Sequence, residues 1–146
     1  MYENALLSLT MCKGATRMTH HEKREFLIQQ RLSECPQYSN IEIPKNEDEQ
    51  KTLLRSLMNI RAPRPIDEEF LHIQDEYLRE EVADKGVTDS AGLPVSPVNS
   101  RLALWRGDIT TLKIDAIVNA ANSALRGCFI PCHSCVDNII HSVSGI

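Results

Sequence analysis

The stretch GDITTLKIDAIVNAAN, residues 107–122, differs in character from the sequence that precedes it. Part of it, DAIVNAAN (115–122), holds a short apolar run bounded by polar residues, and RLALWRGD (101–108) holds a similar run. Short apolar runs of this kind are typical of buried strands. Gly107 and Asp108 supply residues for a turn between the two runs. We therefore expect two strands here, which is how the sheet of an α/β domain begins.

A helix is expected after these strands, because apolar residues return to helical spacing near residue 146. These residues are Val136, Ile139, Ile140 and Val143. Ser134, with Asp137 three residues later, forms a capping signature for the helix. Cys135 would then lie in the first turn, where the positive end of the helix dipole favours a thiolate.

Three further helices are predicted upstream. The first covers residues 20–35, where the apolar residues form a loose face. The second begins after Asn46, which can cap it, and the third begins after Asp67 for the same reason. Gly86 is a natural stop for the third helix. Because each helix has an apolar stripe, we expect the three to pack along a shared seam.

The chain divides into three parts on this basis. Residues 1–19 have no sustained periodicity, and we expect them to be disordered or poorly ordered. Residues 20–99 form a helical N-terminal extension that ends in a linker, since residues 86–99 are rich in Gly, Pro and Ser. Residues 100–146 begin the α/β domain.

Composition and charge exclude several classes of protein. The chain has 146 residues, with 16 basic and 20 acidic side chains and a net charge of −4. This balance provides no basic stripe for nucleic acid. No apolar run approaches the roughly 20 residues that a membrane span needs, and no secretory leader is recognisable at the start. Five cysteines, an odd number, fit a reducing compartment, so we expect a cytoplasmic protein.

The segment GCFIPCHSC (127–135) has the atoms for a zinc site. Cys128, His133 and Cys135 offer two thiolates and an imidazole, and three protein ligands leave a fourth position open, as in catalytic zinc sites. Cys132 is an alternative ligand that would close the site into a structural one. From spacing alone two other interpretations stay open. The cysteines can be reduced thiols with no ligand role, or Cys132 and Cys135 can form a redox pair.

The asparagines of NAAN are the second candidate site. Asn119 and Asn122 follow the predicted strand at its carboxyl end, where open α/β sheets bind ligands. An amide both donates and accepts hydrogen bonds, which suits a sugar hydroxyl. Each Asn can equally be a local turn former. Asp108 has the same ambiguity, because it can accept from a ligand amine or cap a turn.

Taken together, these segments resemble one family. GDITTLKIDAIVNAAN resembles the opening of the macrodomain family, three-layer α/β/α modules that bind ADP-ribose. SALRGCFIPCHSCVDNIIHSVSG (123–145) is similar to the zinc-containing branch of that family, microbial enzymes that remove ADP-ribose from modified proteins. NIRAPRPIDEEFLHIQDEYL (59–78) also looks like the helical N-terminal extension of this branch.

The resemblance implies a role for each matching residue. Asp108 matches the acceptor for the adenine amino group, with the backbone of Ile109 beside it. Asn122 matches the residue that holds the distal ribose next to the scissile bond, which makes it the catalytic candidate. Cys128, His133 and Cys135 are the implied ligands of one zinc ion. At Cys132 the resemblance implies a residue that is not a ligand.

The resemblance therefore implies a zinc-dependent, glycosidase-type hydrolase. Its partners would be mono-ADP-ribosylated proteins and ADP-ribose, with no nucleic acid and no membrane. Zinc would polarise the oxygen at the scissile bond or lower the pKa of a bound water. The alternatives are a non-catalytic ADP-ribose-binding module and a truncated, inactive zinc-binding remnant. A whole macrodomain needs more than residues 100–146, so we expect it to be incomplete here, truncated at its C-terminus, and activity to require the missing part.

Overall fold

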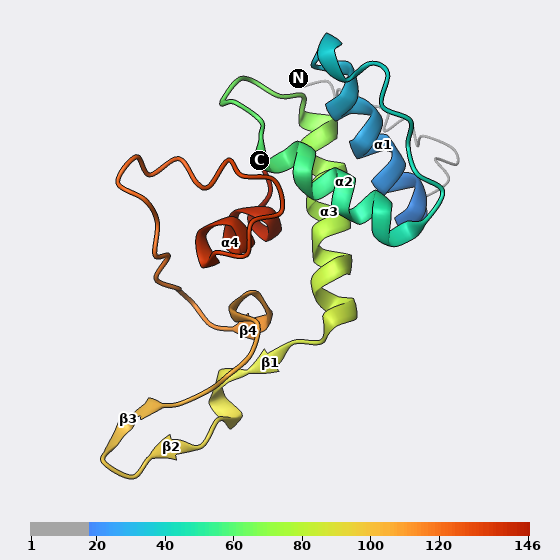
Figure 1. Cartoon of the computed structure of the whole chain (residues 1–146). Coiled ribbons are helices and arrows are strands. Elements are labelled where there is room, and N and C mark those ends of the chain that lie inside the picture. The colour runs from blue at the N-terminus through green and yellow to red at the C-terminus, as the bar shows by residue number, and fades with distance from the viewer. Residues whose placement is uncertain (1–17) are drawn as a thin grey trace, which may run out of the picture.

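The structure is a computed structural model and describes residues 18–146. These residues form four helices, four short strands and three 3₁₀ turns (Figure 1). The helices are α1 (His20–Ser33), α2 (Glu47–Asn59), α3 (Glu68–Lys85) and α4 (Val136–Ser144). The strands are β1 (Thr88–Asp89), β2 (Val95–Ser96), β3 (Asn99–Ala103) and β4 (Leu112–Lys113). The 3₁₀ turns are Pro36–Tyr38, Ser90–Gly92 and Ile109–Thr111.

Side-chain caps start the first three helices. The Thr19 hydroxyl accepts from the backbone N–H of Glu22, whose carboxylate accepts in return from the Thr19 N–H, a complete capping box. Asn46 caps α2 and Asp67 caps α3, as the sequence predicted. Gly86, with φ of 81°, ends α3 in a conformation that favours glycine. The prediction for residues 1–19 falls largely on residues 1–17, which lie outside the described residues.

Helices α1, α2 and α3 share one hydrophobic core, which confirms the predicted seam. Its buried members are Leu27, Ile28, Leu54, Leu57, Met58, Phe70, Ile73 and Tyr77. Burying a side chain of this size stabilises a fold by about 1.5–3 kcal/mol. Leu53, Ile66 and Leu78 are partly buried against this core. This core stabilises α1, α2 and α3 as one unit, called the helical unit below.

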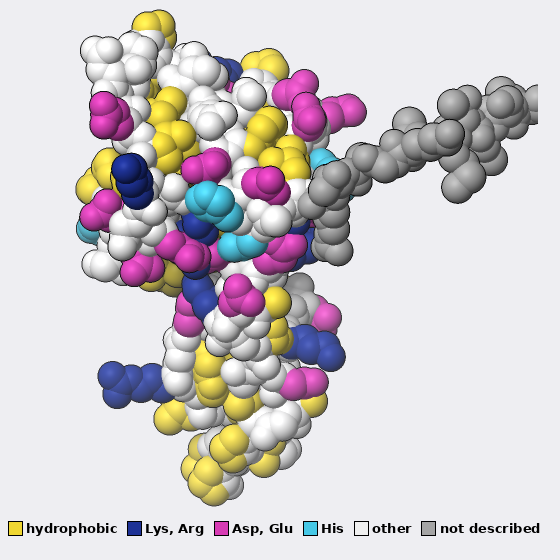
Figure 2. Space-filling model, turned by 90° about the vertical axis from the view of Figure 1, so that its right-hand side faces the viewer, with side chains coloured by type: hydrophobic (Ala, Val, Ile, Leu, Met, Phe, Trp, Pro, Cys, Tyr) yellow, Lys and Arg dark blue, Asp and Glu magenta, His cyan; other side chains and the backbone are white. Residues whose placement is uncertain are grey.

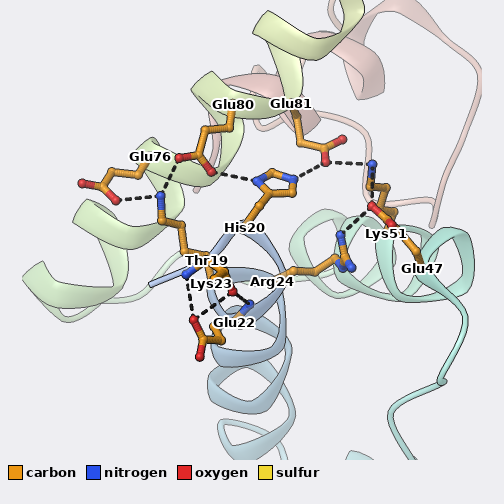
Figure 3. A network of polar contacts seen from close by, with 10 residues as sticks. All are labelled: Thr19, His20, Glu22, Lys23, Arg24, Glu47, Lys51, Glu76, Glu80 and Glu81. Carbon is orange, nitrogen blue, oxygen red and sulfur yellow. Dashed lines mark hydrogen bonds and ion pairs between the residues drawn. The ribbon is translucent and has the colours of Figure 1, made fainter. Parts of the chain in front are cut away.

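A buried cation joins α1 to α3. The side chain of Lys23 is 1% exposed, and its ammonium lies 2.8 Å from a carboxylate oxygen of Glu76 and 2.6 Å from one of Glu80 (Figure 3). Hydrogen bonds that the ammonium donates to these two carboxylates outweigh desolvation and raise the pKa of Lys23 above its usual value. A lysine buried this deeply is stable only when paired.

His20 extends this network toward α2. Its ring stacks on Tyr77, with the ring centroids 4.5 Å apart. Nδ1 lies 2.8 Å from Glu80 and Nε2 lies 2.6 Å from Glu81. Lys51 of α2 pairs with Glu81 at 2.9 Å (Figure 3). Charged groups from all three helices therefore connect them at one end of the core.

The strands form two small sheets. β1 pairs with β4 in parallel, Thr88 opposite Leu112, and β2 pairs with β3 in an antiparallel hairpin that lies away from the helices (Figure 1). The two buried strands predicted from the sequence are not found. β3 is exposed throughout, and residues 115–122 contain no strand. A strand needs a neighbour for its backbone hydrogen bonds, and no described element pairs with residues 115–122. Helices with small sheets remain compatible with an α/β class.

Large apolar side chains are exposed throughout residues 87–130. They are Val87, Val95, Val98, Leu102, Leu104, Ile114, Ile117, Val118, Leu125, Phe129 and Ile130. Figure 2 shows hydrophobic side chains gathered on the lower part of the molecule, below the charged surface of the helical unit. Helix α4 instead packs against α2 and α3. None of the helices in residues 18–146 is long and apolar enough to cross a membrane.

Candidate metal centre

Cys128, His133 and Cys135 come together in the loop before α4. Their ligand atoms all lie within 4.8 Å of one another, and the Cys128 Sγ is 3.6 Å from the His133 Nδ1. Two sulfurs and one imidazole nitrogen at this separation match the ligands that Zn²⁺ accepts tetrahedrally. The cluster can therefore hold a metal ion. Among residues 18–146 it is the one group of three or more such side chains close enough to do so.

The start of α4 differs from the sequence-based expectation. The N-cap is Cys135 rather than Ser134, and its sulfur accepts from the backbone N–H of Asn138 at 3.4 Å. A side-chain acceptor at the N-cap binds the N–H of the second or third helical residue, and here the Cys135 sulfur binds that of the third. Two contacts lower the pKa of Cys135 below its usual value of 9.0. The hydrogen bond from the Asn138 N–H has the larger effect, and the hydrogen bond with His133 has the smaller. This shift favours the thiolate, the form that binds metal.

Cys132 lies apart from this cluster. Its sulfur is 3.2 Å from the Ser56 hydroxyl and 3.5 Å from the carbonyl oxygen of Thr52, both on α2. The residue has φ of 52°, which turns the chain immediately before His133. The four cysteines that the structure describes are all free thiols. The geometry thus groups three of the four candidate ligands and directs the fourth thiol toward the helical unit.

Asn122 is engaged in local contacts. Asn122 donates to the Gly127 carbonyl at 2.9 Å and accepts from the Ala124 N–H at 3.0 Å, which is turn-forming behaviour. The contact with Gly127 connects Asn122 to the loop of residues 127–135, which holds the cluster and is called the metal loop below. Ile109 begins the 3₁₀ turn that Asp108 caps.

Asp108 caps the 3₁₀ turn Ile109–Thr111 and contacts α3. One carboxylate oxygen accepts from the backbone N–H and hydroxyl of Thr110, and the other is 3.3 Å from the Lys85 ammonium on α3. Burial opposes ionisation, but these hydrogen bonds outweigh it and hold the pKa of Asp108 below its usual value. The carboxylate is therefore ionised and available as an acceptor.

A polar chain that the sequence analysis missed lies beside the metal loop. Asn119 donates to the carboxylate of Asp137 at 2.8 Å, and His141, one turn along α4, lies 3.3 Å from the same oxygen. The Asp137 side chain is buried, although the sequence analysis gave it only a capping role. The i,i+4 spacing of Asp137 and His141 was the available signal. Next to His141, a cavity of about 240 Å³ reaches Cys128 and Arg126.

Fold and site together define a protein of helices and small sheets with a candidate Cys–His–Cys metal centre. The chain is 54% identical over 133 residues to the protein-ADP-ribose hydrolase of Treponema medium, which covers 88% of this chain and 50% of that protein. It is 39% identical over 132 residues to the protein-ADP-ribose hydrolase of Staphylococcus aureus, covering 90% of this chain and 48% of that protein. No protein-family model matches the chain.

A fungal protein matches over a shorter range. A probable bifunctional ADP-ribose hydrolase/ADP-ribosyltransferase of Fusarium oxysporum is 42% identical over 102 residues, 64% of this chain and 17% of that protein. The chain spans about half the length of the two bacterial relatives. Relatives that match most of this chain are thus named as hydrolases, the class of enzyme expected from the sequence.

Proposed function

We propose that this chain is part of a zinc-dependent hydrolase that removes ADP-ribose from mono-ADP-ribosylated proteins. The observation that carries the proposal is the 54% identity, over 88% of the chain, to a protein-ADP-ribose hydrolase. The Cys–His–Cys cluster supports the zinc-dependent form of this activity, since a metal-assisted hydrolase needs such ligands and an open coordination position.

Zinc is the metal that this ligand set favours. Thiolate and imidazole ligands select Zn²⁺ over Mg²⁺ and Ca²⁺, which prefer oxygen. We propose that Cys128, His133 and Cys135 hold one ion, with Cys132 outside the site. Bound there, zinc would act as a Lewis acid or lower the pKa of a water toward ~7. The lowered pKa of Cys135 supports this assignment, because metal binding requires the deprotonated thiol.

The substrate residues follow from the same proposal. Asp108 would accept a hydrogen bond from the adenine amino group, with the Ile109 backbone alongside, and its lowered pKa keeps it an acceptor at neutral pH. Asn122 would orient the distal ribose beside the scissile bond. Its hydrogen bond to Gly127, the residue before Cys128, supports a position next to the metal loop.

Residues 100–146 would then be the first part of an α/β/α macrodomain. The exposed apolar side chains of residues 87–130 support this, because a larger sheet would bury side chains of this kind. A partner strand for residues 115–122 would also satisfy their backbone groups. We propose that the hydrolase activity belongs to a protein in which these side chains are covered.

The test is release of ADP-ribose from a mono-ADP-ribosylated protein, followed by the loss of the ADP-ribose mass from the substrate. The enzyme is the protein isolated from its source, before and after a chelator. We expect release to stop without metal and to return with Zn²⁺. Cys128→Ala should lose zinc and release together, whereas Cys35→Ala, in the helical unit, should keep both. Release by a zinc-free protein contradicts the proposal.

Calorimetry with free ADP-ribose separates the alternatives. Binding of ADP-ribose without release from the modified protein favours a non-catalytic binding module. One zinc ion per chain without ADP-ribose binding favours an inactive remnant.

A further inference from the structure

One face of α2 lies against the metal loop. Leu54, Leu57 and Met58 face the core, whereas polar residues on the other side of the helix face the loop and α4. At i, i+3, i+4 and i+7, these residues are Thr52, Arg55, Ser56 and Asn59. Thr52 contacts Cys132 with its backbone carbonyl, whereas the other three contact the loop or α4 with their side chains. We infer that this polar stripe of α2 positions the metal ligands, with Arg55 as its principal positioning residue. The inference rests on the proposed metal site.

Arg55 contacts the loop and α4 at three points. Nη2 donates to the carbonyl oxygen of His133 at 2.9 Å and to the side-chain oxygen of Asn138 at 2.7 Å, and Nε donates to the Ser142 hydroxyl at 3.2 Å. His133 is a candidate ligand, so Arg55 fixes the backbone of a ligand directly. These partners lie 78 to 87 residues away in the sequence.

Asn138 extends this contact to the other two ligands. Its side chain is fully buried and donates to the carbonyl oxygens of Cys128 at 3.1 Å and Ile130 at 3.0 Å. Its backbone N–H donates to the Cys135 sulfur. Arg55 binds the remaining polar atom of this amide, the oxygen. The Arg55 guanidinium is therefore connected to His133 directly and to Cys128 and Cys135 through Asn138.

The rest of the stripe fixes the turn before His133. Asn59 accepts from the backbone N–H of Cys132 at 3.0 Å and donates to the Ser142 hydroxyl at 3.0 Å. Ser56 contacts the Cys132 sulfur at 3.2 Å. These contacts hold Cys132 with φ of 52°, a conformation that costs a non-glycine residue free energy and persists only where neighbours enforce it.

Metal affinity is higher when α2 orders the metal loop before the ion binds. Fixing the backbone of a loop costs conformational entropy, and a loop that is already ordered by α2 loses this entropy during folding and not during metal binding. Groups that orient metal ligands typically change metal affinity by roughly 10–100-fold when they are removed. The helical unit is in this respect part of the metal site.

The experiment measures metal affinity in the 146-residue chain. Co²⁺ is titrated while its thiolate charge-transfer absorption is recorded, and Zn²⁺ affinity is measured by competition with a chromogenic chelator. Arg55→Met removes the guanidinium but keeps the apolar stem. Arg55→Lys keeps the positive charge but lacks the planar guanidinium that donates from both Nε and Nη2. Arg79→Met is the matched control, because the Arg79 side chain is 78% exposed on α3 and pairs only with Asp75 in the described residues.

We expect Arg55→Met to weaken Co²⁺ and Zn²⁺ binding by about tenfold or more. Arg55→Lys should fall between it and the wild type, and Arg79→Met should match the wild type. Circular dichroism verifies the helical fold of each variant. If Arg55→Met does not fold, Arg55→Lys decides, and wild-type affinity in that variant overturns the inference.

Two further outcomes distinguish this inference from the proposed function. Wild-type affinity in a folded Arg55→Met chain overturns the role of Arg55 and leaves the metal site intact. A wild-type chain that binds neither Co²⁺ nor Zn²⁺ overturns the metal site, and the inference with it.

Discussion

The sulfur of Cys132 lies 3.2 Å from the hydroxyl oxygen of Ser56, on the helix that packs beside the metal loop. The other two cysteines of the loop gather with His133. Four residues of one nine-residue segment therefore separate into a three-ligand cluster and a thiol that contacts α2. This separation is the geometry of a site with an open coordination position.

Zinc content should distinguish the cysteines. We expect Cys128→Ser to lose the single bound zinc ion, because a three-ligand site that loses a thiolate binds metal poorly. Cys132→Ser should keep one zinc ion per chain, because its thiol contacts Ser56. Native mass spectrometry with metal analysis measures both. Loss of zinc in Cys132→Ser would show that its sulfur is a ligand.

Binding of ADP-ribose should depend on the carboxylate of Asp108. Asp108→Asn keeps an oxygen that can accept from the Thr110 N–H but removes the charge. Since a hydrogen bond to a charged group contributes about 1.5–3 kcal/mol, we expect binding to weaken by about tenfold or more. Titration calorimetry with ADP-ribose is the measurement, with Asp115→Asn as the control. Equal affinity in both variants would exclude Asp108 from the adenine site.

Stability should fall in acid through the α1–α3 ion pairs. Hydrogen bonds from Lys23 and then His20 lower the pKa of Glu80 below its usual value of 4.5. A carboxyl with a lowered pKa stabilises the folded state above 4.5, and this contribution is lost as the pH falls through the folded-state value. Lys23 has a raised pKa, so its contribution is present below 10.5 and is lost at higher pH.

Urea unfolding between pH 7 and pH 3 measures this dependence. We expect the free energy of unfolding to decrease below pH 4.5, and to decrease less in Lys23→Met, in which Glu80 has lost its main partner. Lys23→Met should itself cost about 1–3 kcal/mol at pH 7, less than a fully buried pair because Glu76 and Glu80 are about one-third exposed. An identical acid slope in wild type and variant would contradict this explanation.

Replacing a core leucine by alanine should lower the free energy of unfolding far more than replacing an exposed one. Leu54 is buried between the helices, and Leu54→Ala should lower the free energy of unfolding by about 2–5 kcal/mol. Leu104 is 91% exposed, and Leu104→Ala should change it by no more than about 0.5 kcal/mol. Urea unfolding of both variants is the measurement. A large cost for Leu104→Ala in the protein from its source would show that another segment covers this side chain.

The helices could be predicted from the sequence because their signals are local. Asn46 and Asp67 cap residues two or three positions away, and the apolar stripes repeat within each helix. The Cys–His–Cys spacing is also local, since it fits within eight residues. The buried strands predicted at 101–108 and 115–122 are not found, because a strand forms only where a neighbour pairs with it, and a local apolar run does not show whether that neighbour is present.

The sequence by itself determined the three upstream helices, the caps Asn46 and Asp67 of two of them, and the residue types of a zinc site. Only the tertiary structure decided that Cys132 turns to Ser56 and that Arg55 reaches His133. The physical reason is separation along the chain. Contacts between residues three or four apart follow from helical geometry, whereas the Arg55–His133 contact spans 78 residues and exists only because α4 packs against α2.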